Sequence, residues 1–69
     1  MKRGDLIWYE YKEGNIDEVF LGIYLSYRNA KWSEYHRFHS ILTIRGGVEE
    51  FVLRIGNEHR VVVVQEIGG

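Results

Sequence analysis

Between residues 41 and 64 the chain has three runs rich in apolar residues, which two glycine-containing turns separate. The turns are Gly46-Gly47 and Gly56-Asn57-Glu58. Glycine reaches positive φ without a Cβ clash, so a glycine pair between two alternating runs is typical of a β-hairpin. We therefore predict three consecutive strands, with Ile41 as a core candidate and with Phe51, Leu53 and Ile55 on one face of the strand that carries them. The three predicted strands are Phe38–Arg45, Val48–Ile55 and His59–Glu66.

Two further strands are predicted nearer the N-terminus, at Asp5–Tyr11 and Glu18–Arg28. In the first, Ile7, Tyr9 and Tyr11 alternate with Leu6, Trp8 and Glu10, so side chains of each set share one face. Gly22 in the middle of the second strand predicts a bend. The polar residues 12–17 between the two strands predict a loop, from which Ile16 folds back onto the core. The inward face of the second strand is expected to be Val19, Leu21, Ile23 and Leu25.

Two stretches leave alternatives open. Residues 29–37 carry no clear pattern and predict a loop with strand ends, although the spacing of Trp32, Tyr35 and Phe38 by three also fits a single helical turn. Residues 61–64 are four consecutive valines. A strand that is apolar on both faces is covered on both faces. The cover is expected from the N-terminal strand and loops, or from a second copy of the chain.

Short strands, glycine turns and no long helical pattern favour an all-β, five-stranded and mostly antiparallel barrel that forms a single domain over residues 1–69. The net charge of −1 argues against a dedicated duplex-DNA binder, which shows a strong basic excess. No apolar run is long enough to cross a bilayer, and the N-terminus lacks the apolar region of a signal peptide. We therefore expect a cytoplasmic protein with no membrane partner.

Three stretches resemble SH3-like small barrels, in the right order along the chain. They are Lys2–Ile7, the glycine-centred Leu21–Leu25 and the hairpin Leu42–Val52. The layout is similar to that of KOW and Tudor domains, and above all to short SH3-like proteins encoded by tailed bacteriophages. The resemblance implies a fold and names no function, and a phage origin would place the protein in the cytoplasm or in a virion. From the residues discussed below we expect a non-enzymatic interaction or accessory module. Proline-containing 3₁₀ segments precede the last strand of peptide-binding SH3 domains, whereas Gly56-Asn57-Glu58 stands here, which argues against proline-rich ligands.

The polar residues indicate neither catalysis nor a bound cofactor. His36 and His39 are three positions apart, and residues three apart on a strand point to opposite faces. A metal site needs three or four converging ligands, so no metal site is expected. Glu49 and Glu50 are adjacent and also face opposite sides, so they cannot act as an acid–base pair.

The aromatic residues are too numerous for one small core, so part of them is expected at the surface. Tyrosine and tryptophan beside arginine are typical of binding hot spots, and we predict a protein-binding surface of Tyr9, Tyr11, Trp32 and Tyr35. Large aromatic residues that close the barrel ends would explain the same composition. The partner is expected to be another protein, including a second copy that forms a homo-oligomer. The alternative is a nucleic-acid surface that uses Trp32 with Arg28, Lys31 and Arg37.

Overall fold

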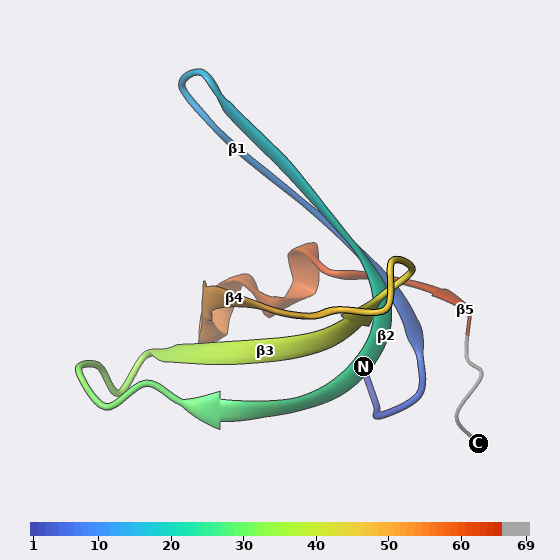
Figure 1. Ribbon diagram of the computed structural model, residues 1–69. Helices are drawn as coiled ribbons and strands as arrows, with labels where there is room; N and C mark the ends of the chain where they lie inside the picture. Colours follow the sequence, from blue (N-terminus) through green and yellow to red (C-terminus); the bar gives the residue numbers. More distant parts are fainter. Residues whose placement is uncertain (66–69) are drawn as a thin grey trace.

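The computed structural model describes residues 1–65, which form one antiparallel sheet of five strands in the order β4-β3-β2-β1-β5 (Figure 1). The prediction of an all-β domain is confirmed. Within the described residues, β4 and β5 each pair on one side only, so the sheet is not closed into a barrel. The strands are β1 (Leu6–Glu13), β2 (Ile16–Asn29), β3 (His36–Thr43), β4 (Val48–Arg54) and β5 (Val62–Gln65).

The hairpin of β1 and β2 is longer than predicted and projects from the rest of the sheet (Figure 1). A two-residue turn, Gly14 and Asn15, joins the strands, and Gly14 has a φ of +57° that favours glycine. Most of the predicted polar loop is therefore strand. Ile16 pairs with Glu13 at the far end of the hairpin and is 52% exposed. The expectation that Ile16 folds back onto the core is wrong, because the hairpin carries it away from the core.

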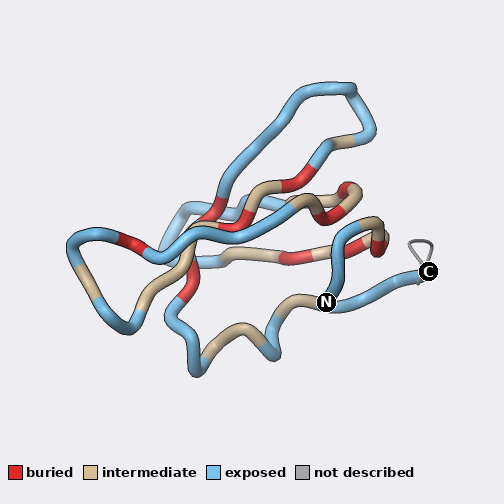
Figure 2. The backbone as a smooth tube through the Cα atoms, turned by 90° about the horizontal axis from the view of Figure 1, so that it is seen from below, coloured by how far each residue is buried: buried red, intermediate tan, exposed pale blue. Residues whose placement is uncertain are grey.

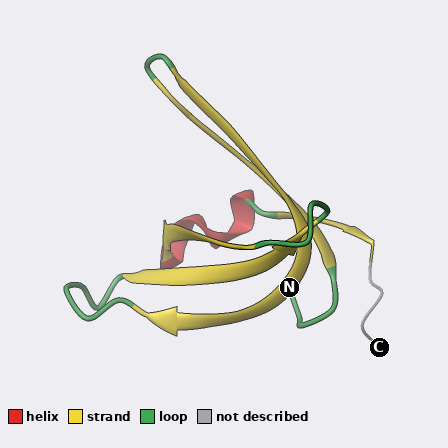
Figure 3. Ribbon diagram, in the orientation of Figure 1, coloured by secondary structure: helices red, strands yellow, loops and turns green. Residues whose placement is uncertain are grey.

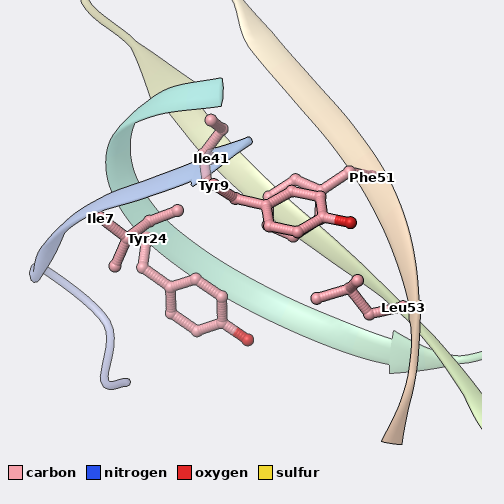
Figure 4. Packing of buried hydrophobic residues seen from close by; sticks show 6 residues of the cluster. All are labelled: Ile7, Tyr9, Tyr24, Ile41, Phe51 and Leu53. Atoms are coloured by element: carbon pink, nitrogen blue, oxygen red, sulfur yellow. The ribbon is translucent and has the colours of Figure 1, made fainter. Parts of the chain in front are cut away.

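The core lies on the face of the sheet that carries the aromatic residues (Figure 4). The face predicted for the second strand is wrong: Tyr24 on β2 is buried, whereas Val19 is 56% exposed. The pairing of Ile7 with Gly22 and of Tyr9 with Phe20 explains the error, because directly opposed residues share a face. The aliphatic face of β2 is thus the outer one. The buried cluster consists of Ile7, Tyr9, Tyr24, Ile41, Phe51 and Leu53.

β2 pairs with β1 along its first half and with β3 along its second half, and it curves strongly between them (Figures 1 and 2). The register shifts between Tyr24 and Ser26, where Leu25 is an extra residue. At Gly22 the backbone of β3 comes so close that a Cβ atom would lie 2.3 Å from the carbonyl oxygen of Leu42. The bend predicted from Gly22 thus coincides with a close backbone approach and an adjacent bulge.

The last part of the chain differs most from the prediction. β4 ends at Arg54, and η1 (Ile55–Arg60) forms a 3₁₀ helix where a short turn was expected (Figure 3). Ile55 was predicted to share a strand face with Phe51 and Leu53, but it lies in η1 and is 38% exposed. No helix within residues 1–65 has the length and apolar content needed to cross a membrane.

The valine run is less covered than expected. Val61 packs partly against the core, but Val62, Val63 and Val64 are 47%, 38% and 54% exposed. The N-terminal strand and the loops within residues 1–65 therefore do not cover both faces of the valine strand. The predicted strand end at Glu66 lies outside the described residues. The connection between β2 and β3 is a loop, as predicted, and an Ala30 N–H bond to the His36 carbonyl at 3.0 Å closes it.

Candidate functional site

A groove adjoins β4 and is lined by that strand, by the projecting β1–β2 hairpin and by Arg28 and Phe38 of the neighbouring strands. One part is a cavity of about 470 Å³ and the next is a cavity of about 380 Å³. Both parts are lined by Tyr9, Tyr11 and Val52, so they adjoin one another. Around the first part lie also Glu18, Phe20, Arg28, Phe38, Glu50 and Phe51.

Stacked aromatic rings form the floor of the groove. The centroid of the Phe51 ring lies 4.9 Å from that of Tyr9 and 5.1 Å from that of Phe20. Tyr9 and Phe51 are 5% and 6% exposed, so their neighbours hold both rings in place. Burial raises the pKa of the Tyr9 hydroxyl above 10.0, against a smaller opposing effect of Arg60, so the ring stays uncharged at neutral pH. A floor that is ordered before binding lowers the entropic cost of binding.

Charges of both signs border this apolar floor. Arg28 Nη2 lies 3.2 Å from Glu50 Oε2, and the Arg28 guanidinium lies 4.1 Å from the centroid of the Phe38 ring. Glu18 on the hairpin lines the same cavity. An apolar centre with a polar rim is the common anatomy of a protein interface.

Three of the four predicted binding residues line this groove. Tyr9 contributes to its floor, Tyr11 to its hairpin wall, and Trp32, which is 64% exposed, lies at its far end against the His36 ring at 4.8 Å. Tyr35 does not line either cavity; it is 62% exposed and lies 5.8 Å from the guanidinium of Arg54.

Phe20, Phe38, Phe51 and Val52 complete the groove and were not among the predicted site residues. A signal for Phe20 was present in the sequence. A two-residue turn at Gly14-Asn15 fixes the hairpin register, and that register places Phe20 directly opposite Tyr9. No comparable local signal places β4 beside the hairpin, because that approach depends on the curvature of the whole sheet.

The three basic residues of the nucleic-acid alternative do not form one surface. Arg28 is paired with Glu50, and Arg37 Nη1 lies 3.1 Å from Glu58 Oε1. Arg28 is directly opposite Phe38 in the sheet, and Arg37 is the neighbour of Phe38 in sequence, so the two arginine side chains lie on opposite faces. Lys31, in the loop between β2 and β3, lines a hollow of about 510 Å³ together with Trp32 and Arg37, so the structure brings these three predicted residues together and leaves out Arg28.

A buried polar cluster lies on the core side of the sheet, away from the predicted residues. His39 is fully buried, with Nδ1 at 2.9 Å from the Tyr24 hydroxyl and Nε2 at 3.1 Å from Glu58 Oε2. The second contact is not aligned as a hydrogen bond, so we treat it as electrostatic. Glu58 belongs to η1, and its contacts with His39 and Arg37 connect that helix to β3.

Burial lowers the pKa of His39 below 6.5, although the Glu58 carboxylate acts in the opposite direction. The ring is therefore neutral at pH 7. His36 is engaged elsewhere, with Nδ1 at 2.7 Å from the Ser33 hydroxyl. Within residues 1–65, no three histidine, cysteine, aspartate or glutamate side chains are grouped so that they could hold a metal ion.

Comparisons with protein-family models, with curated proteins and with solved structures find no match for this chain. The function is therefore inferred from the groove and from the edge of the sheet beside it.

Proposed function

We propose that this chain is a non-enzymatic protein-interaction module with an SH3-like layout, and that the groove along β4 is its binding site. The observation that carries the proposal is the position of an unpaired strand edge directly beside a preformed aromatic floor. An extended segment of another protein can add to such an edge as a further strand. Its backbone supplies hydrogen bonds, and its alternate side chains enter the groove.

The backbone of β4 is oriented for this mode of binding. The Thr43 N–H donates to the Gly47 carbonyl at 2.9 Å, and the Ile55 N–H donates to the Tyr35 carbonyl at 2.7 Å. In an antiparallel pair, hydrogen-bonded positions alternate with positions whose polar groups point away from the partner strand. Odd-numbered residues of β4 thus bond to β3, and Glu50, Val52 and Arg54 direct their N–H and C=O groups to the open edge.

Several features support the SH3-like layout. The strongly curved β2 is shared between the β1–β2 hairpin and the β3–β4 hairpin, which gives the sheet two differently directed halves (Figure 1). A 3₁₀ helix, η1, precedes the last strand, although it contains no proline. The aromatic residues of the groove provide the surface that a protein partner would cover.

A protein partner is favoured over a nucleic acid because Arg28 and Arg37 are paired with carboxylates and do not share one face. Arg28 and Arg37 are held in ion pairs with Glu50 and Glu58, and they lie on opposite faces of the sheet. Glu18 and Glu50 line the aromatic groove and would repel a phosphate backbone.

Selection from a displayed library of random 12-residue peptides tests the proposal. We expect enrichment of extended sequences that alternate apolar and polar residues. Tyr11→Ala should weaken the binding of selected peptides by about tenfold or more, since hot-spot aromatics contribute at least ~1–2 kcal/mol. Tyr35→Ala is the matched control outside the groove and should bind as the wild type does.

Two results would count against the proposal. The first is the absence of enriched peptides, or selected peptides that bind Tyr11→Ala and wild type equally well. The second is binding of a single-stranded oligonucleotide that falls steeply as salt is raised, which would favour the nucleic-acid alternative.

A further inference from the structure

We propose that the strand bound along β4 is β4 of a second copy of this chain, in a two-fold symmetric antiparallel pair centred on Val52. The inference rests on the proposed function, because it names the partner of the same edge. In this pair, β4 of the second copy is the segment that binds beside the groove.

Within residues 1–65, β4 is the longer and more regular of the two sheet edges. It has seven residues and pairs with β3 without a break in register, whereas β5 has four residues and its register with β1 shifts between Leu6 and Ile7. Natural proteins protect an open edge with lysine, proline, bulges or short strands. β4, with the sequence VEEFVLR, contains no lysine, proline or bulge, and its charged residues Glu49, Glu50 and Arg54 restrict an added strand to a register that pairs opposite charges.

The backbone pattern of β4 permits a symmetric pair centred on Val52. The polar groups of Glu50, Val52 and Arg54 point to the open edge, as the bonds of the neighbouring odd-numbered positions to β3 require. If two Val52 residues are opposed, each donates to and accepts from the other. The backbone N–H and C=O groups of Glu50 in each copy then bond to those of Arg54 in the other copy. About six backbone hydrogen bonds result in this register.

The side chains make this register self-complementary. Glu50, Val52 and Arg54 alternate with the buried Phe51 and Leu53, so they share the outer face of β4 and are exposed. Opposing Val52 with Val52 places each Glu50 directly across from Arg54 of the other copy. The contact is apolar at its centre and has an opposite-charge pair on each side.

Other registers lack this complementarity. Centring the pair on Glu50 or on Arg54 would place like charges directly opposite each other, which is destabilising. Centring it on Phe51 or on Leu53 would place a charged residue opposite Val52. Within one copy, Glu50 already lies 3.2 Å from Arg28, so in the pair each Glu50 lies between Arg28 of its own copy and Arg54 of the other copy.

The groove adjoins the strand edge to which the second copy would add. The cavities of about 470 Å³ and 380 Å³ adjoin β4 along Glu50, Phe51, Val52, Leu53 and Arg54. Across the groove the hairpin presents Tyr11 and Phe20. In the two-fold pair, Phe51 and Leu53 of the second copy lie on the same side of the sheet as that apolar wall, because opposed residues of paired strands share a face.

Sedimentation velocity of the full chain from about 1 μM to 1 mM tests the pair, because edge contacts of this size give dissociation constants within that range. We expect the wild type to pass from monomer to dimer. Glu50→Arg opposes two arginines at each outer position, and Arg54→Glu opposes two glutamates there. Each substitution alone should weaken dimerisation about a hundredfold. Glu34→Arg makes the same charge change in the loop between β2 and β3 and should dimerise normally.

An equal mixture of the Glu50→Arg and Arg54→Glu proteins separates this pairing from any other association. In the mixed dimer both outer positions again combine opposite charges, so dimerisation should return to near the wild-type level. Hydrogen exchange gives a second readout: the amides of Glu50, Val52 and Arg54 should exchange several-fold more slowly at 1 mM than at 10 μM, while that of Phe51 should be slow at both (concentrations approximate).

A wild type that stays monomeric at about 1 mM would overturn the inference. So would a mixture of the two charge variants that associates no better than either alone. If the chain stays monomeric and still binds selected peptides in a way that depends on Tyr11, the symmetric pair is ruled out and the proposed function stands. A dimer that neither charge substitution weakens would show that association uses another surface.

Discussion

His39 and Tyr24 form a fully buried hydrogen-bonded pair between neighbouring strands, with 2.9 Å between His39 Nδ1 and the Tyr24 hydroxyl oxygen. The opposite ring nitrogen of His39 faces the Glu58 carboxylate of η1 at 3.1 Å. If Nδ1 accepts the tyrosine proton, the ring proton lies on Nε2, toward Glu58. Burial of the ring outweighs the attraction of the Glu58 carboxylate for a protonated ring and lowers the pKa of His39, so the folded state favours the neutral imidazole.

The first prediction is that stability falls as the pH is lowered from 7 to 5. Burial lowers the pKa of His39 below the ordinary 6.5, with Glu58 opposing and Arg37 and the N-terminal ammonium adding to the decrease. Below pH 6.5 the unfolded chain therefore binds a proton that the folded chain does not, and stability is lost until the folded-state pKa is reached. Urea unfolding at half-unit pH steps measures the loss.

Substitutions assign this pH dependence to His39. His39→Phe should flatten the stability profile between pH 5 and 7. His59→Gln, which changes an exposed histidine of η1, should leave it as in the wild type. A profile that keeps its slope in His39→Phe would assign the pH dependence to other groups.

The second prediction concerns the close approach of β2 and β3. Gly22→Ala would place a Cβ atom 2.3 Å from the Leu42 carbonyl oxygen, a backbone atom that cannot move without disturbing the sheet. We expect a loss of about 1–3 kcal/mol or more in the free energy of unfolding. Gly47→Ala is the matched control, because nothing lies within 4 Å of its added methyl group. Its free energy of unfolding should change by less than about 0.5 kcal/mol. Equal losses in both variants would contradict the approach seen at Gly22.

The third prediction separates two residues that the sequence placed in one binding surface. Tyr9 is 5% exposed and packs on Phe51, so Tyr9→Ala should cost about 3–5 kcal/mol and leave most of the chain unfolded. Trp32 is 64% exposed, and Trp32→Ala should cost less than about 1 kcal/mol. Circular dichroism during thermal unfolding distinguishes them. Similar melting temperatures for the two variants would contradict their different burial.

The sequence predicted the existence and order of the strands because alternation and glycine turns are local signals. It did not predict which face of β2 is buried. Val19, Leu21, Ile23 and Leu25 form the cleaner aliphatic pattern, yet the core selects the opposite face through pairing with Ile7 and Tyr9. Pattern alone defines two faces, and only the packing of other strands decides between them.

The candidate site was predicted in part for the same reason. Surface aromatic residues indicated binding, and Tyr9, Tyr11 and Trp32 do line the groove. Tyr35 does not, because the loop that carries it directs it to the side of Arg54. The contribution of β4 depends on how far the sheet curves, and no short stretch of sequence specifies that curvature.

The fourth prediction concerns Val63, which the sequence suggested to be buried. Val63 lies directly opposite Ile7 in the sheet, but it is 38% exposed, whereas Ile7 is fully buried. A carboxylate at position 63 keeps contact with water, so Val63→Asp should cost about 1–2 kcal/mol and leave the chain folded. Ile7→Asp places an unpaired charge in the core. Such a charge costs several kcal/mol, against a total stability of about 5 kcal/mol for a small domain, so this chain should unfold. Urea denaturation at a protein concentration of about 1 μM, the lower limit of the range expected for self-association, compares the two. Unfolding of Val63→Asp under these conditions would show that the valine face of β5 is covered in solution.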